Sequence, residues 1–90
     1  MSFVHITSTP GHCLVDYEKV LAALGQDAVA GRVSHTVGEA NGSLCIVDVW
    51  ESQAAADRFA AERLFPAFQS SGVNPVPSTT IIAFEAAGRG

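Results

Sequence analysis

Residues 31–52, with the sequence GRVSHTVGEANGSLCIVDVWES, decide the fold of this chain. Two runs rich in apolar and β-branched residues flank Asn41-Gly42, a pair that readily adopts the left-handed backbone conformations of a two-residue hairpin turn. The pattern predicts one strand from Arg32 to Ala40 and a second from Ser43 to Trp50. Ser52 follows directly and is a suitable N-cap residue for a helix.

The turn also fixes which residues of the two strands face each other. Counting back from the Asn-Gly tip places His35 opposite Asp48. We expect this face to lie against helices, and its members are Val33, His35, Val37, Leu44, Ile46, Asp48 and Trp50. The opposite face has smaller side chains that suit close packing against a partner sheet, and its members are Ser34, Thr36, Gly38, Cys45, Val47 and Val49.

The rest of the chain completes a β-α-β-β-α-β order. Residues 3–8 are rich in β-branched side chains and indicate a strand, and 14–24 repeat apolar residues at helical spacing up to Gly25. A second helix is expected over 53–69, where Pro66 kinks it or ends its regular part, and a last strand over 79–86. This order is typical of an α+β, ferredoxin-like fold, in which two helices cover one face of a four-stranded antiparallel sheet.

Length and composition limit the classes of protein to consider. A chain of 90 residues makes a single domain, which we expect over 1–87 with a flexible tail at 88–90. The net charge is -4 and the basic residues form no stripe, which argues against nucleic acid as a partner. No signal peptide or membrane-length apolar run is visible, so we expect a cytoplasmic protein with reduced cysteines and no membrane partner.

The second hairpin strand is apolar on both sides, which a lone sheet in water does not accommodate. Helices cover only one face of the predicted sheet, so the other face needs a second cover. A short chain with 48% hydrophobic residues is also a natural candidate for oligomerisation. We therefore expect a homodimer that packs sheet face against sheet face.

Short motifs along the chain point to a known group of proteins. They are Pro10-Gly11, Tyr17, Gly31, His35, Gly38, the VDVWES segment at 47–52, Asp57-Arg58-Phe59 and Leu64-Phe65-Pro66. With these motifs the chain resembles the dimeric α/β-barrel superfamily, which includes the antibiotic biosynthesis monooxygenase-like proteins, and is most similar to small bacterial members without an assigned reaction. The resemblance covers nearly the whole chain, and VDVWES is its most specific part. It implies the ferredoxin-like fold and a dimeric barrel.

The resemblance does not single out one activity. Superfamily members include cofactor-free quinone-forming monooxygenases, haem-degrading enzymes, isomerases and proteins with no known reaction. The haem-degrading members carry an Asn on the first strand, a Trp inside the second helix and a later His, whereas this chain has Phe59 in that helix and no His after His35. We expect no cofactor and no metal, because no Gly-rich phosphate loop is present and Cys13 lies far from Cys45 in the sequence.

His35 and Asp48 are the candidate catalytic pair. A carboxylate beside an imidazole favours the protonated ring or fixes its tautomer, so His35 can serve as a general base toward an activated phenol or enol. The candidate substrate-binding residues, which would line a pocket for a flat ligand, are Trp50, Tyr17, Phe59 and His5.

Two functions stay open at this point. The first is a cofactor-independent monooxygenase or isomerase that acts on a compact aromatic or polyketide-like compound. The second is a non-catalytic dimeric module that binds a ligand or stabilises a partner, with His35 and Asp48 as a structural cross-strand pair. A cavity between helices and sheet that reaches His35 favours the first, and a filled core there favours the second.

Overall fold

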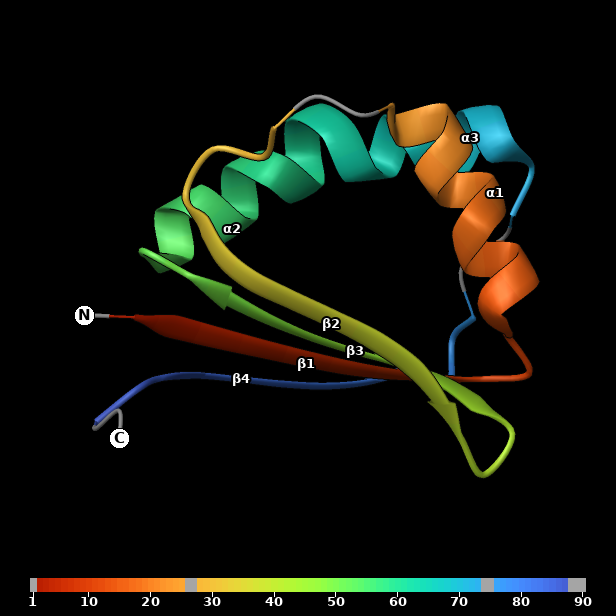
Figure 1. The fold of residues 1–90 in the computed structure, drawn as a ribbon, viewed down its shortest axis with the longest axis horizontal. Coiled ribbons are helices and arrows are strands. Elements are labelled where there is room, and N and C mark those ends of the chain that lie inside the picture. Colours follow the sequence, from red (N-terminus) through yellow and green to blue (C-terminus); the bar gives the residue numbers. More distant parts are fainter. Residues whose placement is uncertain (1, 26–27, 74–75, 88–90) are drawn as a thin grey trace.

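Strands and helices form two layers in the computed structural model, which describes residues 2–25, 28–73 and 76–87 (Figure 1). In chain order the elements are β1 (Phe3–Pro10), α1 (Leu14–Leu24), β2 (Arg32–Ala40), β3 (Ser43–Trp50), α2 (Gln53–Phe59), the π-helical segment η1 (Ala60–Leu64), α3 (Phe65–Ser71) and β4 (Thr80–Glu85). This order confirms the predicted α+β, ferredoxin-like fold. The predicted tail at 88–90 lies outside the described residues.

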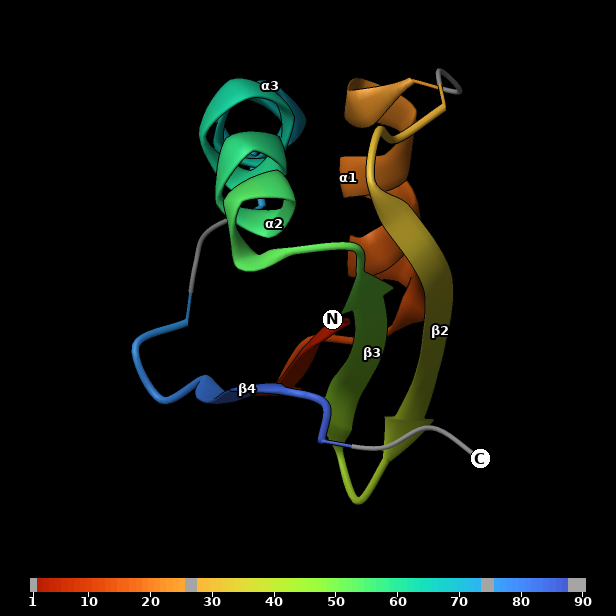
Figure 2. The same cartoon turned by 90° about the vertical axis from the view of Figure 1, so that its left-hand side faces the viewer.

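The sheet is antiparallel, with the strand order β2-β3-β1-β4. All the described helices lie over one face, with α1 toward β2 and with α2 and α3 toward β1 and β4 (Figure 2). β1 and β3 are therefore the central strands, and side chains that point from them toward the helices occupy the middle of the molecule. None of the described helices is both long and apolar enough to cross a membrane.

The hairpin turn forms as its sequence predicts. Asn41 has φ 52° and Gly42 has φ 78°, the two positive values that a tight hairpin turn requires. The predicted register is confirmed, because His35 pairs with Asp48. Only the far end of β2 differs from it.

A β-bulge near the start of β2 corrects one predicted position. Arg32, and not Val33, pairs with Trp50, and the ladder shifts between Arg32 and Ser34. Val33 is the extra residue of the bulge and is 46% exposed. The prediction that Val33 belongs to the helix-facing set is therefore wrong. Arg32 takes that place, with its guanidinium carbon 5.9 Å from the centroid of the Phe59 ring.

Helix α1 is capped by carboxylates. Cys13 stands at the N-cap, where Ser, Thr or Asp is usual, and Asp16 reaches back to accept hydrogen bonds from the Cys13 N–H at 2.9 Å and from its Sγ at 3.4 Å. These two hydrogen bonds, the backbone one first, hold the pKa of Asp16 below its ordinary value of 3.8. Glu39 of β2 accepts from the Leu14 N–H at 3.2 Å, which ties the start of α1 to the edge of the sheet.

The second helical stretch is longer and less regular than predicted. It continues to Ser71, two residues past the predicted end, and its turns are π-helical from Ala60 to Leu64. Pro66 explains the irregularity, because proline has no N–H to donate and its ring crowds the carbonyl four residues back. The wider turn relieves this crowding, and the Phe65 N–H bonds to the Ala60 carbonyl five residues back.

The limits of two predicted strands are corrected by the structure. β1 extends to Pro10 because Thr9 and Pro10 still face Leu44 and Ser43 of β3. β4 spans Thr80–Glu85, one residue shorter at each end than predicted.

The buried core is divided into two clusters. One lies at the end of the sheet near the start of α2 and consists of Phe3, Trp50 and Phe59. The other joins α1 to α3 and the segment after it, and consists of Val20, Ala67 and Val73. We call the first the aromatic end. Neither cluster contains the middle of the helix-facing side of the sheet.

The other face of the sheet carries no helix among the described residues. Register places an apolar set on it from three strands: Val4, Ile6, Val47, Val49, Ile82 and Phe84. Val47 is 37% exposed, Phe84 47% and Ile82 52%. A contiguous apolar surface of this kind is typical of a face that a partner covers.

Candidate functional site

Three polar residues form a row across the middle of the helix-facing side of the sheet. His35 of β2 pairs with Asp48 of β3, and Asp48 pairs on its other side with His5 of β1. Directly opposed residues of antiparallel strands point to the same face. Asp48 is therefore flanked by an imidazole on each side. We call these residues, together with Tyr17 above them, the polar middle.

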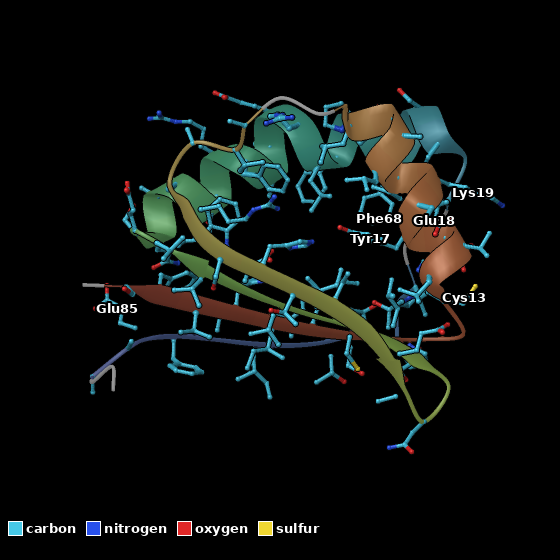
Figure 3. The ribbon with its side chains drawn as sticks, viewed as in Figure 1. Cys13, Tyr17, Glu18, Lys19, Phe68 and Glu85 are labelled. Atoms are coloured by element: carbon cyan, nitrogen blue, oxygen red, sulfur yellow. The ribbon has the colours of Figure 1, made fainter. Side chains whose placement is uncertain are left out.

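A hydrogen-bond chain links the sheet to α1 through this row. His35 Nδ1 bonds to Asp48 Oδ1, and the hydroxyl of Tyr17 lies 2.7 Å from His35 Nε2. The rings of Tyr17 and His35 are stacked, with centroids 5.8 Å apart and an interplanar angle of 23°. Figure 3 shows Tyr17 between the helix layer and the sheet, whereas Lys19 of the same helix points away. The prediction that this face lies against the helices is confirmed.

The network assigns a role to each nitrogen of His35. A carboxylate accepts and does not donate, so the bond to Asp48 places a hydrogen on Nδ1. In the neutral ring Nε2 then carries a lone pair, which accepts the hydrogen bond of the Tyr17 hydroxyl. The arrangement can orient Nε2 as a proton acceptor, and the ionisable hydroxyl of Tyr17 is already in contact with it.

The polar middle is reachable from solvent. The side chain of His35 is 22% exposed and that of Asp48 is 13% exposed, and His5 is also only partly buried. Ile81 of β4, on the same face, is 61% exposed. The helices therefore do not seal this part of the sheet, in contrast to the aromatic end.

Trp50 and Phe59 lie beside the polar middle and not within it. Trp50 is 2% exposed and its ring packs on Phe59 with centroids 5.3 Å apart. The guanidinium carbons of Arg32 and Arg63 lie 5.9 and 5.8 Å from the centroid of the Phe59 ring, which they cover. These two predicted pocket walls bound the polar middle at one end and offer little free surface to a ligand.

The structure sets the register of His5, which the sequence left open. His5 pairs with Asp48 on one side and with Ala83 of β4 on the other. Its side chain makes no hydrogen bond or ion pair with any residue in the described part of the chain. It belongs geometrically to the same site as His35.

Sequence reasoning missed the polar contact of Tyr17. Its spacing with Leu14, Leu21 and Leu24 marks a buried helical stripe, and a tyrosine in such a stripe is predicted to pack by its ring. The one available signal was its hydroxyl, because a partly buried tyrosine needs a hydrogen-bond partner. His35 is that partner.

A separate hollow of about 350 Å³ lies where the start of α1 meets the end of α3. Its lining residues include His12, Asp16, Lys19 and Ser71, and none of the predicted site residues. Within the described residues, no group of His, Cys, Asp and Glu side chains is suited to hold a metal ion.

Comparison with known proteins establishes the fold. No protein-family model matches the chain, and no curated protein matches it in sequence. It superposes on a variant of SnoaB, a cofactor-independent oxygenase from Streptomyces nogalater, with a TM-score of 0.69 at 15% identity, covering 98% of this chain and 95% of that chain. It also superposes on the ActVA-Orf6 monooxygenase of Streptomyces coelicolor, solved with Nanaomycin D, with a TM-score of 0.68 at 19% identity, covering 98% of this chain and 89% of that chain.

The same fold also occurs in a protein of unknown function, NE2512 of Nitrosomonas europaea, with a TM-score of 0.71 at 12% identity, covering 99% of this chain and 92% of that chain. The chain thus has the ferredoxin-like fold of the antibiotic biosynthesis monooxygenase-like proteins, and the resemblance predicted from its motifs is confirmed at the level of fold. At these identities the activity has to be argued from the site.

Proposed function

We propose that this protein is a cofactor-independent enzyme of the monooxygenase or isomerase type, with His35 as the general base. Its substrate is a compact aromatic or polyketide-like compound with an acidic phenol or enol. The observation that carries the proposal is the chain of hydrogen bonds from Tyr17 through His35 to Asp48, on a partly exposed surface. The fold, shared with oxygenases that include SnoaB and ActVA-Orf6, supports it as an analogy.

Each residue has a defined part in this chemistry. Asp48 holds the Nδ1–H of His35 and stabilises the imidazolium that forms when Nε2 takes a proton from the substrate. The Tyr17 hydroxyl occupies Nε2 in the free protein, so it either gives way to the substrate or passes the proton on. Trp50 and Phe59 close one end of the site and limit the length of a bound ring.

Loss of the hydroxyl proton gives a phenolate or enolate, whose negative charge is shared with a carbon atom. In an isomerase, the proton returns to that carbon. In a monooxygenase, that carbon reduces dioxygen: one oxygen atom replaces the hydrogen of the carbon and forms a carbonyl, and the other leaves as water with that hydrogen and the hydroxyl proton. Both start with the same proton transfer, which is the step assigned to His35.

Replacing His35 tests the proposal. In His35→Ala we expect turnover of a quinol-type substrate, followed by oxygen uptake and corrected for spontaneous oxidation, to fall about 10²- to 10⁴-fold. His12→Ala is the matched control, because His12 lies by the separate hollow and away from the sheet row. Unchanged turnover in a folded His35→Ala protein would remove His35 from the mechanism.

The enzyme is proposed to be a homodimer that packs through the helix-free sheet face. Its support is the apolar set on that face, of which Ile82 and Phe84 are about half exposed in one chain. Sedimentation at micromolar concentration is expected to give a dimer, and Ile82→Glu a monomer, because a charge would be buried without a partner. A wild-type monomer would contradict the dimer.

A non-catalytic ligand-binding module is the second candidate. The observation that favours it is that both nitrogens of His35 already have partners within the chain, as in a structural pair. If the protein is such a module, the wild type binds an aromatic probe without turnover, and His35→Ala loses stability.

A further inference from the structure

His5 is the one member of the polar middle that the proposed mechanism does not use. It lies on β1, directly opposite Asp48, on the side away from His35. Within the described chain its side chain has no hydrogen-bond partner, although it is partly buried. A partly buried polar side chain with no protein partner is satisfied by water or by a ligand.

We propose that His5 determines specificity by donating a hydrogen bond to a second oxygen of the substrate, at the ring edge opposite the hydroxyl that faces His35. This selects rings oxygenated at two opposite positions over rings with a single hydroxyl. The inference rests on the proposed function for the placement of the first hydroxyl at His35.

The sheet supplies the geometry for such a clamp. Cα atoms of directly paired residues in neighbouring antiparallel strands lie about 5 Å apart, so His35 and His5, on either side of Asp48, are separated by roughly 10 Å. Both imidazoles rise from the same face. A flat ring lying over Asp48 has one edge at each histidine.

The neighbours of His5 leave room for a ligand atom. Its partner on β4 is Ala83, whose side chain is a single methyl group. The next residue on this face of β4, Ile81, is 61% exposed. His5 is thus bordered by small or uncovered side chains on the side away from Asp48.

The chemistry of His5 fits a donor. An imidazole carries at least one N–H whether it is neutral or charged, so it can always donate one hydrogen bond. When His35 removes the proton from the first hydroxyl, negative charge spreads to the ring carbon that bears the second oxygen. This oxygen then accepts a hydrogen bond more strongly, because less of its lone-pair density is drawn into the ring. A donor placed there is worth more in the transition state than in the ground state.

The test compares two probes that differ in one oxygen, 1,4-dihydroxynaphthalene and 1-naphthol. Their dissociation constants are measured anaerobically by calorimetry, so the readout does not depend on turnover. Wild type is expected to bind the diol about five- to tenfold more tightly, the effect of one added hydrogen bond. His5→Leu is expected to abolish this preference, so that the two probes bind it equally tightly.

His5→Gln and His12→Gln complete the experiment. Glutamine keeps an N–H donor at position 5, so part of the preference is expected to return, and the change at His12 is expected to leave it intact. Circular dichroism checks that each variant is folded, and His5→Gln keeps the test informative if His5→Leu does not fold.

The outcomes separate the two proposals. A wild-type protein that does not prefer the diol, or a His5→Leu protein that keeps the preference, overturns the role of His5, even if His35-dependent turnover is observed. A preference that depends on His5 in a protein without turnover supports the role of His5 and contradicts the enzyme proposal. Failure of both probes to bind overturns both.

Discussion

The aromatic end and the polar middle are neighbours on the same face of the same strands, and they differ in almost every physical property. Phe3 and Trp50 pair across β1 and β3, and two residues along each strand His5 pairs with Asp48. At the first pair, Phe59 of α2 packs on the two side chains, and all three residues are buried. Beside the second pair, the Tyr17 hydroxyl of α1 bonds to His35, which is the other neighbour of Asp48, and the side chains of His35 and Asp48 stay partly exposed.

In this small sheet protein, the residues that supply stability and the proposed functional residues occupy different parts of one sheet face. A domain of this size has little apolar surface to bury, so a closed cluster at one end carries much of the tertiary packing. That leaves the middle free to hold polar groups that are paired with each other. Substitutions at the two regions should therefore have different consequences.

The largest effect is expected at the aromatic end. Trp50→Ala removes a side chain that is 2% exposed and leaves a cavity beside Phe59, so we expect a loss of about 3–5 kcal/mol in the free energy of unfolding. Urea denaturation measures it, with Trp50→Phe as the milder control. A loss in Trp50→Ala no larger than that in His35→Ala would break the comparison.

A smaller effect is expected where β2 enters the aromatic end. Gly31 has φ 81°, and an added Cβ would lie 2.6 Å from the Ala55 Cβ at the start of α2. We expect Gly31→Ala to cost about 1–3 kcal/mol through backbone strain and overpacking. Gly25→Ala is the matched control, since Gly25 has a similar φ of 87° and no atom lies within 4 Å of its added Cβ, and thermal melts of both variants give the cost of overpacking. Equal melting temperatures would contradict this prediction.

A still smaller loss of stability is expected from Tyr17→Phe in the polar middle. It removes the hydroxyl at 2.7 Å from His35 Nε2 and keeps the ring, so we expect at most about 0.5–1.5 kcal/mol of lost stability. Chemical denaturation gives the stability, and the oxygen-uptake assay gives the activity. A stability loss as large as that of Trp50→Ala would mean that this region is core.

The smallest effect concerns pH. Hydrogen bonds from Cys13 lower the pKa of Asp16 in the folded state. The ionised carboxylate therefore stabilises α1 when the pH is above 3.8, the ordinary pKa of this group. The contribution is lost as the pH falls through the lowered folded value. Unfolding free energies followed from about pH 6 downward should decline less in Asp16→Asn than in wild type over this range. An identical decline in both proteins would show that Asp16 does not contribute.

The sequence predicted best what is decided locally. The Asn-Gly turn and the alternation of side chains fixed the pairing of His35 with Asp48, because both strands meet at the same two-residue turn. The position of His5 was not predictable, since β1 pairs with β3 across an intervening helix and strand. Neither the bulge that displaces Val33 nor the π-helical turns before Pro66 has a distinct local pattern.

The contact of Tyr17 in the candidate site was likewise not predictable from the sequence. Helical spacing predicted that it faces the sheet, but which sheet residue meets its hydroxyl depends on how α1 is placed over β2. That placement is fixed in part by the bond from the Leu14 N–H to Glu39, which joins residues 25 positions apart. A contact between residues so far apart in the sequence cannot be predicted from the spacing of side chains within one helix or strand.

The most direct test of the central claim is an anaerobic NMR titration with 1,4-dihydroxynaphthalene that follows the ring nitrogens of the three histidines and the indole N–H of Trp50. We expect the signals of His35 and His5 to shift most, the Trp50 signal to shift much less, and the His12 signals not to move. Shifts confined to Trp50 or His12, with His35 unchanged, would contradict the claim that the polar middle is the ligand site.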